Sequence, residues 1–348
     1  MPQKNLGIIG GGQLGSMLSE AAKKLDIKTT IYSDDINAPA QNFCDDFIFG
    51  NYSDKTKILE FANKVDVITF EFENIPYETL NEMNKLKLVL PKPSVNRLIQ
   101  HRIAEKDFIN KLNIRTTRYV SIEKKSDIET LEDFLPGILK TTTMGYDGKG
   151  QYPLKKIEDI NSLNIDFSKG YVLEKLVKLK KEVSVIITRF GSNSYEVYDP
   201  IENTHQDQIL KYSVIPAEIS EKILVQSKEW ATQIAEELKY IGTLCVEFFI
   251  DRNENLYVNE IAPRVHNSGH LTINAYNISQ FENHIRAVCS MEKVPLKKLH
   301  NAKMVNLIGD QIEPYRKNLI LNDKEFFFDY LKKEIKEKRK MGHITYLL

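Results

Sequence analysis

The sequence predicts a chain of more than one domain that combines α/β and α+β architecture, and three observations lead to this fold class. The 348 residues are long for a single hydrophobic core. In residues 1–97 short strands alternate with helices, which is typical of a doubly wound sheet. Beyond residue 115 the strands follow one another with fewer helices between them. We therefore expect a first α/β domain, a small domain around a glycine-rich loop, and a larger C-terminal domain.

The first domain is expected to alternate four strands with three helices. Strands are predicted over residues 5–9, 28–35, 45–50 and 65–73, and helices over residues 16–25, 54–64 and 77–85. The first strand runs into Gly10-Gly-Gly-Gln-Leu-Gly15, a GxGxxG turn, and the acids Asp34 and Asp35 follow about 20 residues later. Because the start of a helix offers unpaired N–H groups to anions, the turn predicts a phosphate site. The motif does not distinguish a dinucleotide from a sugar phosphate.

Acidic residues end the fourth strand of this domain. Glu71 and Glu73 lie at the carboxyl end of that strand, where doubly wound sheets place ligands. The ordinary polarity of a strand end explains them equally well. A connecting helix is then predicted over residues 95–112, on which Arg102 either faces solvent or contacts a phosphate.

The second domain is expected to surround the loop KTTTMGYDGKGQ, residues 140–151. Strands are predicted over residues 118–122, 137–143, 150–154 and 171–177, and a helix over residues 126–134. Lys140 closes a strand before a loop with three glycines, so the loop can fold its N–H groups over phosphates that the lysine contacts. It lacks the GxxxxGK[ST] pattern of a Walker loop. A glycine-rich hairpin without a ligand is the simpler alternative.

The larger domain is expected to consist mainly of strands. Strands are predicted over residues 181–190, 194–203, 246–250, 256–261 and 301–309, and helices over residues 218–238 and 279–289. Trp230, Ile234 and Leu238 recur at helical spacing, which predicts core packing. The chain ends in a basic stretch, residues 330–348.

Carboxylates lie inside the hairpin formed by VEFFI and LYVNEI. Glu247 is in the first strand, and Asn259 and Glu260 are at the end of the second. A carboxylate in an apolar strand is costly unless it is paired or binds a cation, and oxygen ligands favour Mg²⁺. A shift of one residue decides whether Asn259 or Glu260 faces Glu247, and the sequence leaves this open. Two solvent-facing acids on an edge strand are the alternative interpretation.

The loop after this hairpin, residues 262–270, is unusually polar. Its sequence APRVHNSGH contains an arginine, two histidines and an asparagine, together with a proline and a glycine that mark a loop. A strand-end loop of this polarity predicts an anion or substrate pocket.

The amino-acid composition limits the classes of molecule that the protein is expected to bind. Lys and Arg number 48, and so do Asp and Glu, which argues against nucleic acid or a membrane as the main partner. We expect small-molecule partners. The N-terminus enters a strand without a cleavable leader, and no run of about 18 apolar residues occurs, so we expect a cytoplasmic protein. Cys44, Cys245 and Cys289 are odd in number and widely spaced, which predicts reduced thiols.

Set in order, these segments resemble an ATP-grasp ligase. GIIGGGQLGSML, KTTTMGYDGKGQ, HQDQI, VEFF with NEIAPRVHNSGH, and RKMGHIT together resemble the N5-carboxyaminoimidazole ribonucleotide synthetase family of bacterial purine biosynthesis. The resemblance covers nearly the whole chain. It implies an ATP-grasp fold: a Rossmann-like domain over residues 1–97, an ATP-grasp domain over residues 98–292 with its lid over residues 115–177, and a C-terminal substrate-binding subdomain over residues 293–348.

The resemblance also implies the reaction. An enzyme of this family joins ATP, bicarbonate and 5-aminoimidazole ribonucleotide through carboxyphosphate, and releases N5-carboxyaminoimidazole ribonucleotide, ADP and phosphate. It needs Mg²⁺, for which Mn²⁺ can substitute, and it is a homodimer.

The family's ATP site carries over to matching positions. The resemblance implies that Arg102 and Lys140 contact phosphates, that the 145–151 loop closes over them, and that the 174–177 strand holds adenine. Glu174 or Glu182 would bind the ribose hydroxyls, with His205 nearby. The implied ATP-binding residues are Arg102, Lys140, Gly145, Tyr146, Asp147, Gly148, Lys149, Gly150, Gln151, Glu174, Lys175, Leu176, Val177, Glu182, His205, Asn259 and Glu260, and the implied metal ligands are Glu247 and Glu260.

The second substrate carries over in the same way. The residues implied to bind the ribonucleotide are Gly12, Gln13, Leu14, Glu73, Lys332, Arg339 and Lys340. The residues implied to act in catalysis are Tyr146, Asp147, Lys149, Arg264, His266 and Asn267. Either His266 or Asp147 would handle the amine proton.

The sequence departs from the family at a few positions. Met144 stands where many relatives have Gly, and Phe328 and Lys336 stand where His and Arg are frequent. The chain stops at Leu348, where relatives usually continue into another helix, so we expect a shortened C-terminal subdomain.

Other functions explain parts of the pattern. An NAD-dependent oxidoreductase accounts for the 10–15 turn and Asp34, but leaves Glu247 and Glu260 without a task. A formate-dependent glycinamide ribonucleotide transformylase accounts for the ATP site, but does not match NSGH and RKMGH. A noncatalytic nucleotide sensor would not need the two carboxylates.

Overall fold

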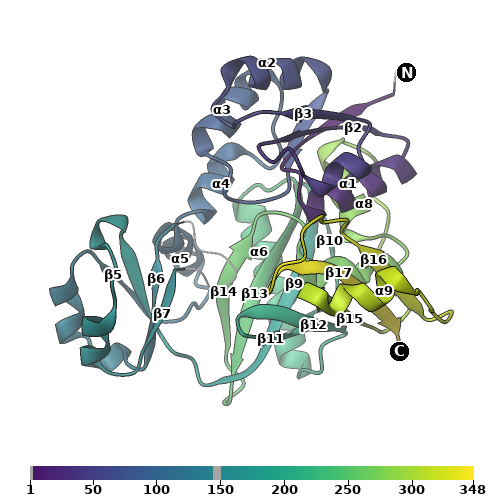
Figure 1. The fold of residues 1–348 in the computed structure, drawn as a ribbon. Helices are drawn as coiled ribbons and strands as arrows, with labels where there is room; N and C mark the ends of the chain where they lie inside the picture. The colour runs from purple at the N-terminus through teal and green to yellow at the C-terminus, as the bar shows by residue number, and fades with distance from the viewer. Residues whose placement is uncertain (1–2, 144–149) are drawn as a thin grey trace.

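The computed structural model describes residues 3–143 and 150–348. The described residues form three sheets, which Figure 1 shows as three parts of the molecule. The N-terminal part lies at the top of the view, and the part that contains β5, β6 and β7 stands out to one side. The C-terminal segment, drawn in yellow, folds back against the large central sheet.

The first part is the predicted doubly wound domain. Its strands are β1 (Asn5–Ile9), β2 (Lys28–Ser33), β3 (Asp46–Phe49) and β4 (Val67–Phe70), and its helices are α1 (Gln13–Lys24), α2 (Lys55–Lys64) and α3 (Tyr77–Leu86), with a 3-10 turn η1 (Pro39–Asn42). The sheet is parallel in the order β3-β2-β1-β4. Because β1 and β4 are neighbours, the glycine turn after β1 lies beside the acids that follow β4.

The single connecting helix predicted over residues 95–112 is wrong. Two helices occur there, α4 (Pro93–Ile99) and α5 (Arg102–Lys111). His101 between them has an extended backbone, and its Nδ1 accepts the N–H of Ala104 at 3.3 Å, which caps the start of α5. Arg102 is therefore the first residue of a new helix, and α5 runs beside the edge of the large sheet.

The second part is an antiparallel sheet of order β5-β8-β6-β7. Its strands are β5 (Tyr119–Ile122), β6 (Gly137–Thr141), β7 (Gln151–Leu154) and β8 (Tyr171–Lys175). The helix predicted over residues 126–134 is wrong: the segment forms two 3-10 turns, η2 (Lys125–Thr130) and η3 (Glu132–Phe134). Asp127 accepts the N–H groups of Glu123 and Lys124, which tightens the first turn. Two further turns, η4 (Ile157–Ser162) and η5 (Phe167–Lys169), pack in the same hydrophobic cluster as η2 and η3.

The large sheet joins nine strands in the order β14-β13-β9-β11-β12-β15-β17-β16, with β10 paired to β9. They are β9 (Leu179–Gly191), β10 (Ser194–Val197), β11 (Ile201–Gln206), β12 (Ile209–Ile215), β13 (Gly242–Asp251), β14 (Leu256–Ala262), β15 (Ala302–Ile308), β16 (Glu325–Asp329) and β17 (Lys340–Leu347). The accompanying helices are α6 (Glu221–Glu237), α7 (Thr272–Ala275), α8 (Gln280–Val288) and α9 (Glu313–Lys317), with 3-10 turns η6 (Asn267–Leu271) and η7 (Gly309–Ile312).

Two predictions for this sheet differ from the structure. The strand predicted over residues 194–203 is two strands, β10 and β11, because Pro200 interrupts the ladder between them. The basic stretch at the C-terminus, predicted without a strand, contains β17, and the preceding segment contains β16. Through β15 these strands extend the same sheet that carries the carboxylate hairpin.

Hydrophobic packing holds the parts in place. Ile234 and Leu238 of the α6 segment are buried in one core with β9 and β13, and Trp230 is partly buried against that core, as the helical spacing predicts. A second core joins α1 to α8, so the first domain packs on the large one. All three cysteines carry free thiols. Within the described part of the chain, no helix has the length and apolar character needed to cross a membrane.

Candidate functional site

The hairpin β13–β14 brings the two predicted metal ligands opposite each other. Glu247 pairs with Glu260 across the ladder, whereas the next pair is Phe248 with Val258. Asn259 is thus the extra residue of a β-bulge. The register question is resolved in favour of Glu260, and directly opposed residues project from the same face of a sheet.

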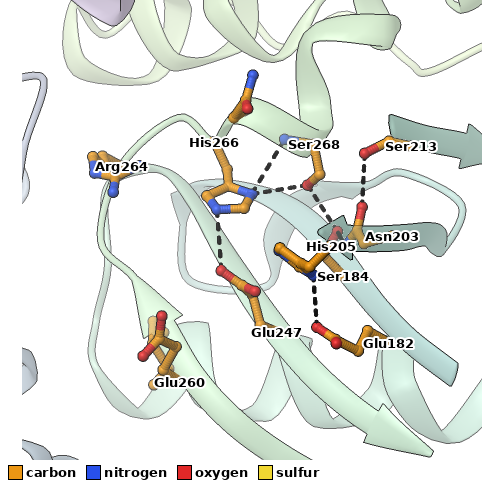
Figure 2. A network of polar contacts seen from close by, with 12 residues as sticks. Glu182, Ser184, Asn203, His205, Ser213, Glu247, Glu260, Arg264, His266 and Ser268 are labelled. Carbon is orange, nitrogen blue, oxygen red and sulfur yellow. Dashed lines mark hydrogen bonds and ion pairs between the residues drawn. The ribbon is translucent and has the colours of Figure 1, made fainter. Parts of the chain in front are cut away.

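Each of these carboxylates has a basic partner. Nε2 of His266 lies 3.1 Å from Oε1 of Glu247, and Nη1 of Arg102 donates to Oε2 of Glu260 at 2.8 Å. Figure 2 shows His266 reaching down from its loop to Glu247. Burial opposes ionisation of Glu247, but the electrostatic attraction and the hydrogen bond of the His266 imidazole outweigh it, so the pKa of Glu247 is lowered to about 2. Glu247 is therefore an anion at any physiological pH.

The donor set around the bulge fits a hard cation. Oδ1 of Asn259 is buried and has no hydrogen-bond partner among the described residues, which is costly unless a ligand satisfies it. Together with Glu247 and Glu260 it offers oxygen ligands alone. No cluster of three or more His, Cys, Asp or Glu side chains suited to a metal occurs in residues 3–143 and 150–348. Two carboxylates plus a nucleotide phosphate are the usual protein environment of Mg²⁺, so these residues fit that ion.

Helix α5 clamps the strand that carries Glu260. β14 is the edge strand of the sheet; the carbonyl of Arg115 accepts the N–H of Val258, and α5 supplies further hydrogen bonds to the outer edge of β14. Oε1 of Glu105 accepts the N–H of Ile261 at 2.6 Å, and Nζ of Lys106 donates to the carbonyl of Asn259 at 3.3 Å. Both side chains are buried. The clamp fixes the backbone on either side of Glu260.

Buried ion pairs connect helix α5 to the small domain. Nζ of Lys106 lies 3.4 Å from Oε2 of Glu174 on β8, and Nζ of Lys140 on β6 lies 3.0 Å from the same oxygen. Burial opposes ionisation of Glu174, but these two lysines outweigh it and lower its pKa to about 2. Lys140, predicted to contact phosphate, is thus held by Glu174 at the base of its loop.

The other predicted ATP residues lie near these strands. Among the described residues, the backbone N–H groups of Lys175 and Leu176 bond to the carbonyls of Arg118 and Pro136, and the Leu176 side chain is half exposed. Gln151 begins β7 opposite Lys140, and the carbonyl of the preceding Gly150 accepts the N–H of Thr141 at 2.9 Å. The predictions for Gly145, Tyr146, Asp147, Gly148 and Lys149 fall outside the described residues.

Glu182 and His205 form a second acid–base pair. Nδ1 of His205 lies 2.9 Å from Oε2 of Glu182, as Figure 2 shows on strands β9 and β11. Burial disfavours the charged imidazole, but Glu182 and, less strongly, Glu247 outweigh it, so the pKa of His205 is raised. Glu182 is partly exposed whereas Glu174 is buried. Of the two acids predicted for the ribose, Glu182 is therefore the accessible one.

The glycine turn differs from the prediction. Oε1 of Glu71 accepts the N–H of Gly12 at 2.7 Å, and Oε2 accepts the N–H of Gly15 at 3.1 Å. A Cβ atom at Gly12 would lie 2.7 Å from Glu71, so the glycines make room for this carboxylate. The N–H groups of Gly12 and Gly15 are thus not offered to a phosphate, because Glu71, which follows β4, already accepts both of them.

Arg264 lies between the first domain and the metal hairpin. Its Nε forms a short ion pair with Glu73, and the charge of Arg264 lowers the pKa of Glu73 despite the opposing effect of burial. The positive charge of Arg264 also favours the ionised forms of Glu71 and Glu247. Asn267, predicted to act in catalysis, is buried and exchanges hydrogen bonds of 2.7 and 3.2 Å with Asn306 of β15.

The C-terminal segment brings lysines back to this region. Nζ of Lys332 donates to Oε1 of Gln13 at 2.8 Å and to the carbonyl of Lys340 at 2.7 Å. Lys340 is close enough to His205 for its charge to affect that side chain. Arg339 is partly exposed and donates to the carbonyl of Glu334 at 3.2 Å. Residues far apart in sequence thus meet beside the glycine turn.

Sequence reasoning missed several residues of this site. The roles of Glu105 and Lys106 went unnoticed because charges on a helix usually face solvent. Ser184, Asn203 and Ser213 were also missed, although a small polar residue within an apolar strand is an available signal. These last three lie in a network that Figure 2 shows next to His266 and Ser268.

Comparison with known families covers the chain in three segments. Residues 3–100 match the ribonucleotide synthetase preATP-grasp domain, residues 107–281 match the ATP-grasp domain, and residues 302–348 match the phosphoribosylaminoimidazole carboxylase C-terminal domain. The predicted ATP-grasp fold with a preceding Rossmann-like domain is confirmed.

Curated relatives match over nearly the whole length. N5-carboxyaminoimidazole ribonucleotide synthase of Brucella melitensis is 39% identical over 99% of this chain and 96% of its own length. The Bacillus subtilis enzyme of the same name is 37% identical over 99% of this chain and 92% of its own.

Solved structures agree with these relatives. The Staphylococcus aureus N5-carboxyaminoimidazole synthetase complexed with ADP has a TM-score of 0.93 and 35% identity, and covers 99% of this chain and 93% of its own. The Aspergillus clavatus enzyme in complex with ADP and 5-aminoimidazole ribonucleotide has a TM-score of 0.91 and 26% identity, over 99% and 94% of the two chains. The resemblance stated from the sequence is therefore confirmed.

Proposed function

Because the chain belongs to the N5-carboxyaminoimidazole ribonucleotide synthase family of ATP-grasp ligases, we propose how its own residues perform that family's reaction. The chain is an ATP-dependent ligase that carboxylates 5-aminoimidazole ribonucleotide in purine biosynthesis. The observation that carries the proposal is the register of the hairpin, which sets Glu247 opposite Glu260. Lys106 of α5 links the strand of Glu260 to Glu174, which also pairs with Lys140 of the small domain.

ATP lies between the small domain and the hairpin in this proposal. Arg102 and Lys140 contact the phosphates, and the 145–151 loop closes over them. The 174–177 strand holds adenine by its backbone. Glu182, kept accessible and paired with His205, binds the ribose hydroxyls. Glu174 instead serves as the buried partner that orients Lys140.

Mg²⁺ is held by Glu247 and Glu260, with Asn259 as the third oxygen ligand, and Mn²⁺ can replace it. The unpartnered Oδ1 of Asn259 and the two opposed carboxylates support this assignment. When bound, the ion offsets the negative charge that spreads over the transferred phosphoryl group.

The ribonucleotide lies on the side of the hairpin opposite ATP, between the first domain and the C-terminal segment. Its pocket comprises Gly12, Gln13, Leu14, Glu73, Lys332, Arg339 and Lys340. Since Glu71 occupies the N–H groups of Gly12 and Gly15, the 5′-phosphate is held by the C-terminal cations rather than by the glycine turn. Arg264 and Asn267 complete the wall towards the metal.

The reaction proceeds in three steps. A bicarbonate oxygen attacks the γ-phosphorus of ATP, ADP leaves, and carboxyphosphate forms. Carboxyphosphate then breaks its C–O bond to give CO₂ and phosphate. The 5-amino group captures CO₂ as a carbamate and loses one proton, which either His266 or Asp147 handles. Tyr146 and Lys149 on the loop, with Arg264, position the reactants and exclude water while carboxyphosphate exists.

Partners and location follow as expectations from the family. We place the protein in the cytoplasm as a homodimer whose partners are small molecules, without nucleic acid or membrane. The balanced charge of 48 basic and 48 acidic residues and the three free thiols support this assignment.

The experiment is an assay of ADP release with labelled bicarbonate. ADP formation should require Mg²⁺ and 5-aminoimidazole ribonucleotide together, and the label should enter an acid-labile carbamate. NAD binding without ADP formation would reject the proposal in favour of an oxidoreductase. ADP formation that depends on formate and glycinamide ribonucleotide would instead indicate the transformylase.

A further inference from the structure

A row of buried polar side chains crosses the large sheet beneath the 267–271 turn. Ser213 on β12 pairs with Asn203 on β11, Ser184 on β9 lies opposite Ile201 two residues away, and Glu247 on β13 pairs with Ser184. Alternate residues of a strand share a face, so these side chains point to the same side of the sheet. Ser184 and Ser213 are fully buried, and Asn203 is 6% exposed.

The row is joined into one chain by hydrogen bonds, which Figure 2 draws as dashed lines. Oγ of Ser213 donates to Oδ1 of Asn203 at 2.8 Å, and Nδ2 of Asn203 donates to Oγ of Ser184 at 2.9 Å. Oγ of Ser184 lies 2.8 Å from Oγ of Ser268, which lies 2.8 Å from Nδ1 of His266. Nε2 of His266 ends the chain on Glu247.

Donor and acceptor roles along this chain have one consistent direction. The backbone N–H of Ser268 points at Nδ1 of His266, so this nitrogen is an acceptor. The Ser268 hydroxyl therefore donates to Nδ1 and accepts from Ser184. Ser184 in turn accepts from the amide of Asn203, which can only donate through its Nδ2 atom. Every hydroxyl proton is thus directed towards His266, and the imidazole proton is left on Nε2, facing Glu247.

We propose that this relay, formed by Ser213, Asn203, Ser184 and Ser268, is a positioning device for the metal site: it fixes the tautomer and orientation of His266, which holds one oxygen of Glu247 and leaves the other to the cation. The inference rests on the proposed function, since it assumes that Glu247 is a metal ligand. Partners of this kind behind a metal ligand typically change metal affinity or activity by about 10- to 100-fold.

A positioning role accounts for the polar residues that occur within otherwise apolar strands. A buried hydroxyl or amide is tolerated only when its hydrogen bonds are satisfied, and here each one is satisfied by the next member of the relay. The same strands offer a matched comparison. Thr188 of β9 and Thr243 of β13 form a buried hydroxyl pair at 2.7 Å, which continues to the carbonyl of Gln280 and, among the described residues, makes no hydrogen bond to the His266 imidazole.

The test compares Ser184→Ala and Ser268→Ala with the control Thr188→Val. Binding of Mn²⁺ in the presence of ADP is measured from the electron paramagnetic resonance signal of the free ion. We expect a loss of about 10-fold in affinity for each relay variant and none for the control. Turnover of the relay variants should recover at high Mg²⁺, with the KM for the ribonucleotide unchanged.

Two further readouts separate positioning from general damage. The ¹⁵N spectrum of labelled histidine, in which His266 is identified by its loss in His266→Gln, should show an unprotonated Nδ1 in the native chain and a changed tautomer balance in Ser184→Ala. In the His266→Gln background, Ser184→Ala should cause no further loss of Mn²⁺ affinity. Unchanged affinity and tautomer in both relay variants would overturn the inference, and so would an equal loss in Thr188→Val. Failure of the native chain to bind Mn²⁺ with ADP would instead reject the metal site of the proposed function, and the inference with it.

Discussion

Two regions of this molecule place carboxylates next to backbone turns, and they use them in opposite ways. At the glycine turn, Glu71 gives both of its oxygens to backbone N–H groups of Gly12 and Gly15. At the hairpin, Glu247 and Glu260 each have a side-chain partner, His266 and Arg102, that engages a single oxygen. Both oxygens of the first carboxylate accept backbone hydrogen bonds, whereas each of the other two is paired through one oxygen in the part of the chain that the structure describes.

The difference shows that a sequence motif has to be judged by the hydrogen-bond and ion-pair partners that its polar groups have in the fold. The GxGxxG turn has the sequence of a phosphate site, yet an acid of the same chain occupies it. The hairpin has no recognised short motif, yet its unpartnered Asn259 oxygen and opposed carboxylates fit a cation. If this comparison is right, substitutions at the hairpin should affect turnover, and substitutions at the glycine turn should affect stability.

The largest effect is expected at the hairpin. Glu247→Gln or Glu260→Gln keeps the shape of the side chain but removes a charge from the metal site, so turnover should fall by roughly 10²-fold or more. Thermal unfolding should show that the fold is retained. Glu254→Gln, in the turn of the same hairpin, is the matched control and should keep native turnover. Near-native turnover in both site variants would make these residues structural acids.

The next effect concerns the C-terminal cations. Arg339→Ala removes a charge-assisted contact to the 5′-phosphate worth about 1.5 to 3 kcal/mol, so the KM for the ribonucleotide should rise by roughly 10- to 150-fold. The KM for ATP should hardly change, because ATP lies on the other side of the hairpin. Lys336→Ala, in the same basic run and paired with Glu334, should leave both values unchanged. Equal changes for both substrates would assign Arg339 to surface charge.

At the glycine turn the expected effect is on stability. Glu71→Gln can accept only one of the two N–H groups, which should reduce the free energy of unfolding by about 1 to 3 kcal/mol. Denaturant titration measures the loss. Turnover at 25 °C should stay within a few-fold of native. An unchanged free energy of unfolding would contradict the view that Glu71 holds the N–H groups of Gly12 and Gly15.

The smallest effect is a pH dependence at the clamp. Burial, reinforced by the charge of Glu260, raises the pKa of Glu105 from 4.5 to about 8. An acid whose pKa is raised in the folded state stabilises below its unfolded value, and that stability is lost as pH rises from about 4.5 through 8. Glu105→Gln, which imitates the protonated acid, should therefore gain in Tm relative to native by a few degrees between pH 6 and pH 9. A Tm difference that does not vary with pH would show that Glu105 does not titrate there.

Local patterns in the sequence predicted the regular elements well. The 3.6-residue and 2-residue periods located β1, α2, β13 and β14, and the helix predicted over residues 54–64 starts at Asp54, the residue that caps α2 in the structure. Glu247, Glu260, Arg264 and His266 were identified because unusual polarity stands out in an apolar strand or a tight loop. Their meeting in one place is a property of the fold that the family resemblance anticipated.

What the sequence could not predict depends on contacts between distant residues. The break at His101 arises from a side-chain cap within an otherwise helical pattern. Strand β17 was missed because its basic neighbours suggested a solvated segment, whereas pairing with β15 and β16 buries it. The carboxylate that accepts the N–H groups of the glycine turn is Glu71, which lies 56 residues from Gly15 in the sequence. No rule based on neighbouring residues relates the two.

The central claim is that Glu247 and Glu260 share the catalytic metal. Anomalous diffraction from a crystal grown with Mn²⁺ and ADP tests it most directly, because the signal locates the ion independently of any assay. The account predicts a peak that both carboxylates coordinate through one oxygen each, with His266 on the remaining oxygen of Glu247 and Arg102 on that of Glu260. A peak bound elsewhere, or nucleotide bound with neither carboxylate in contact with the ion, would contradict it.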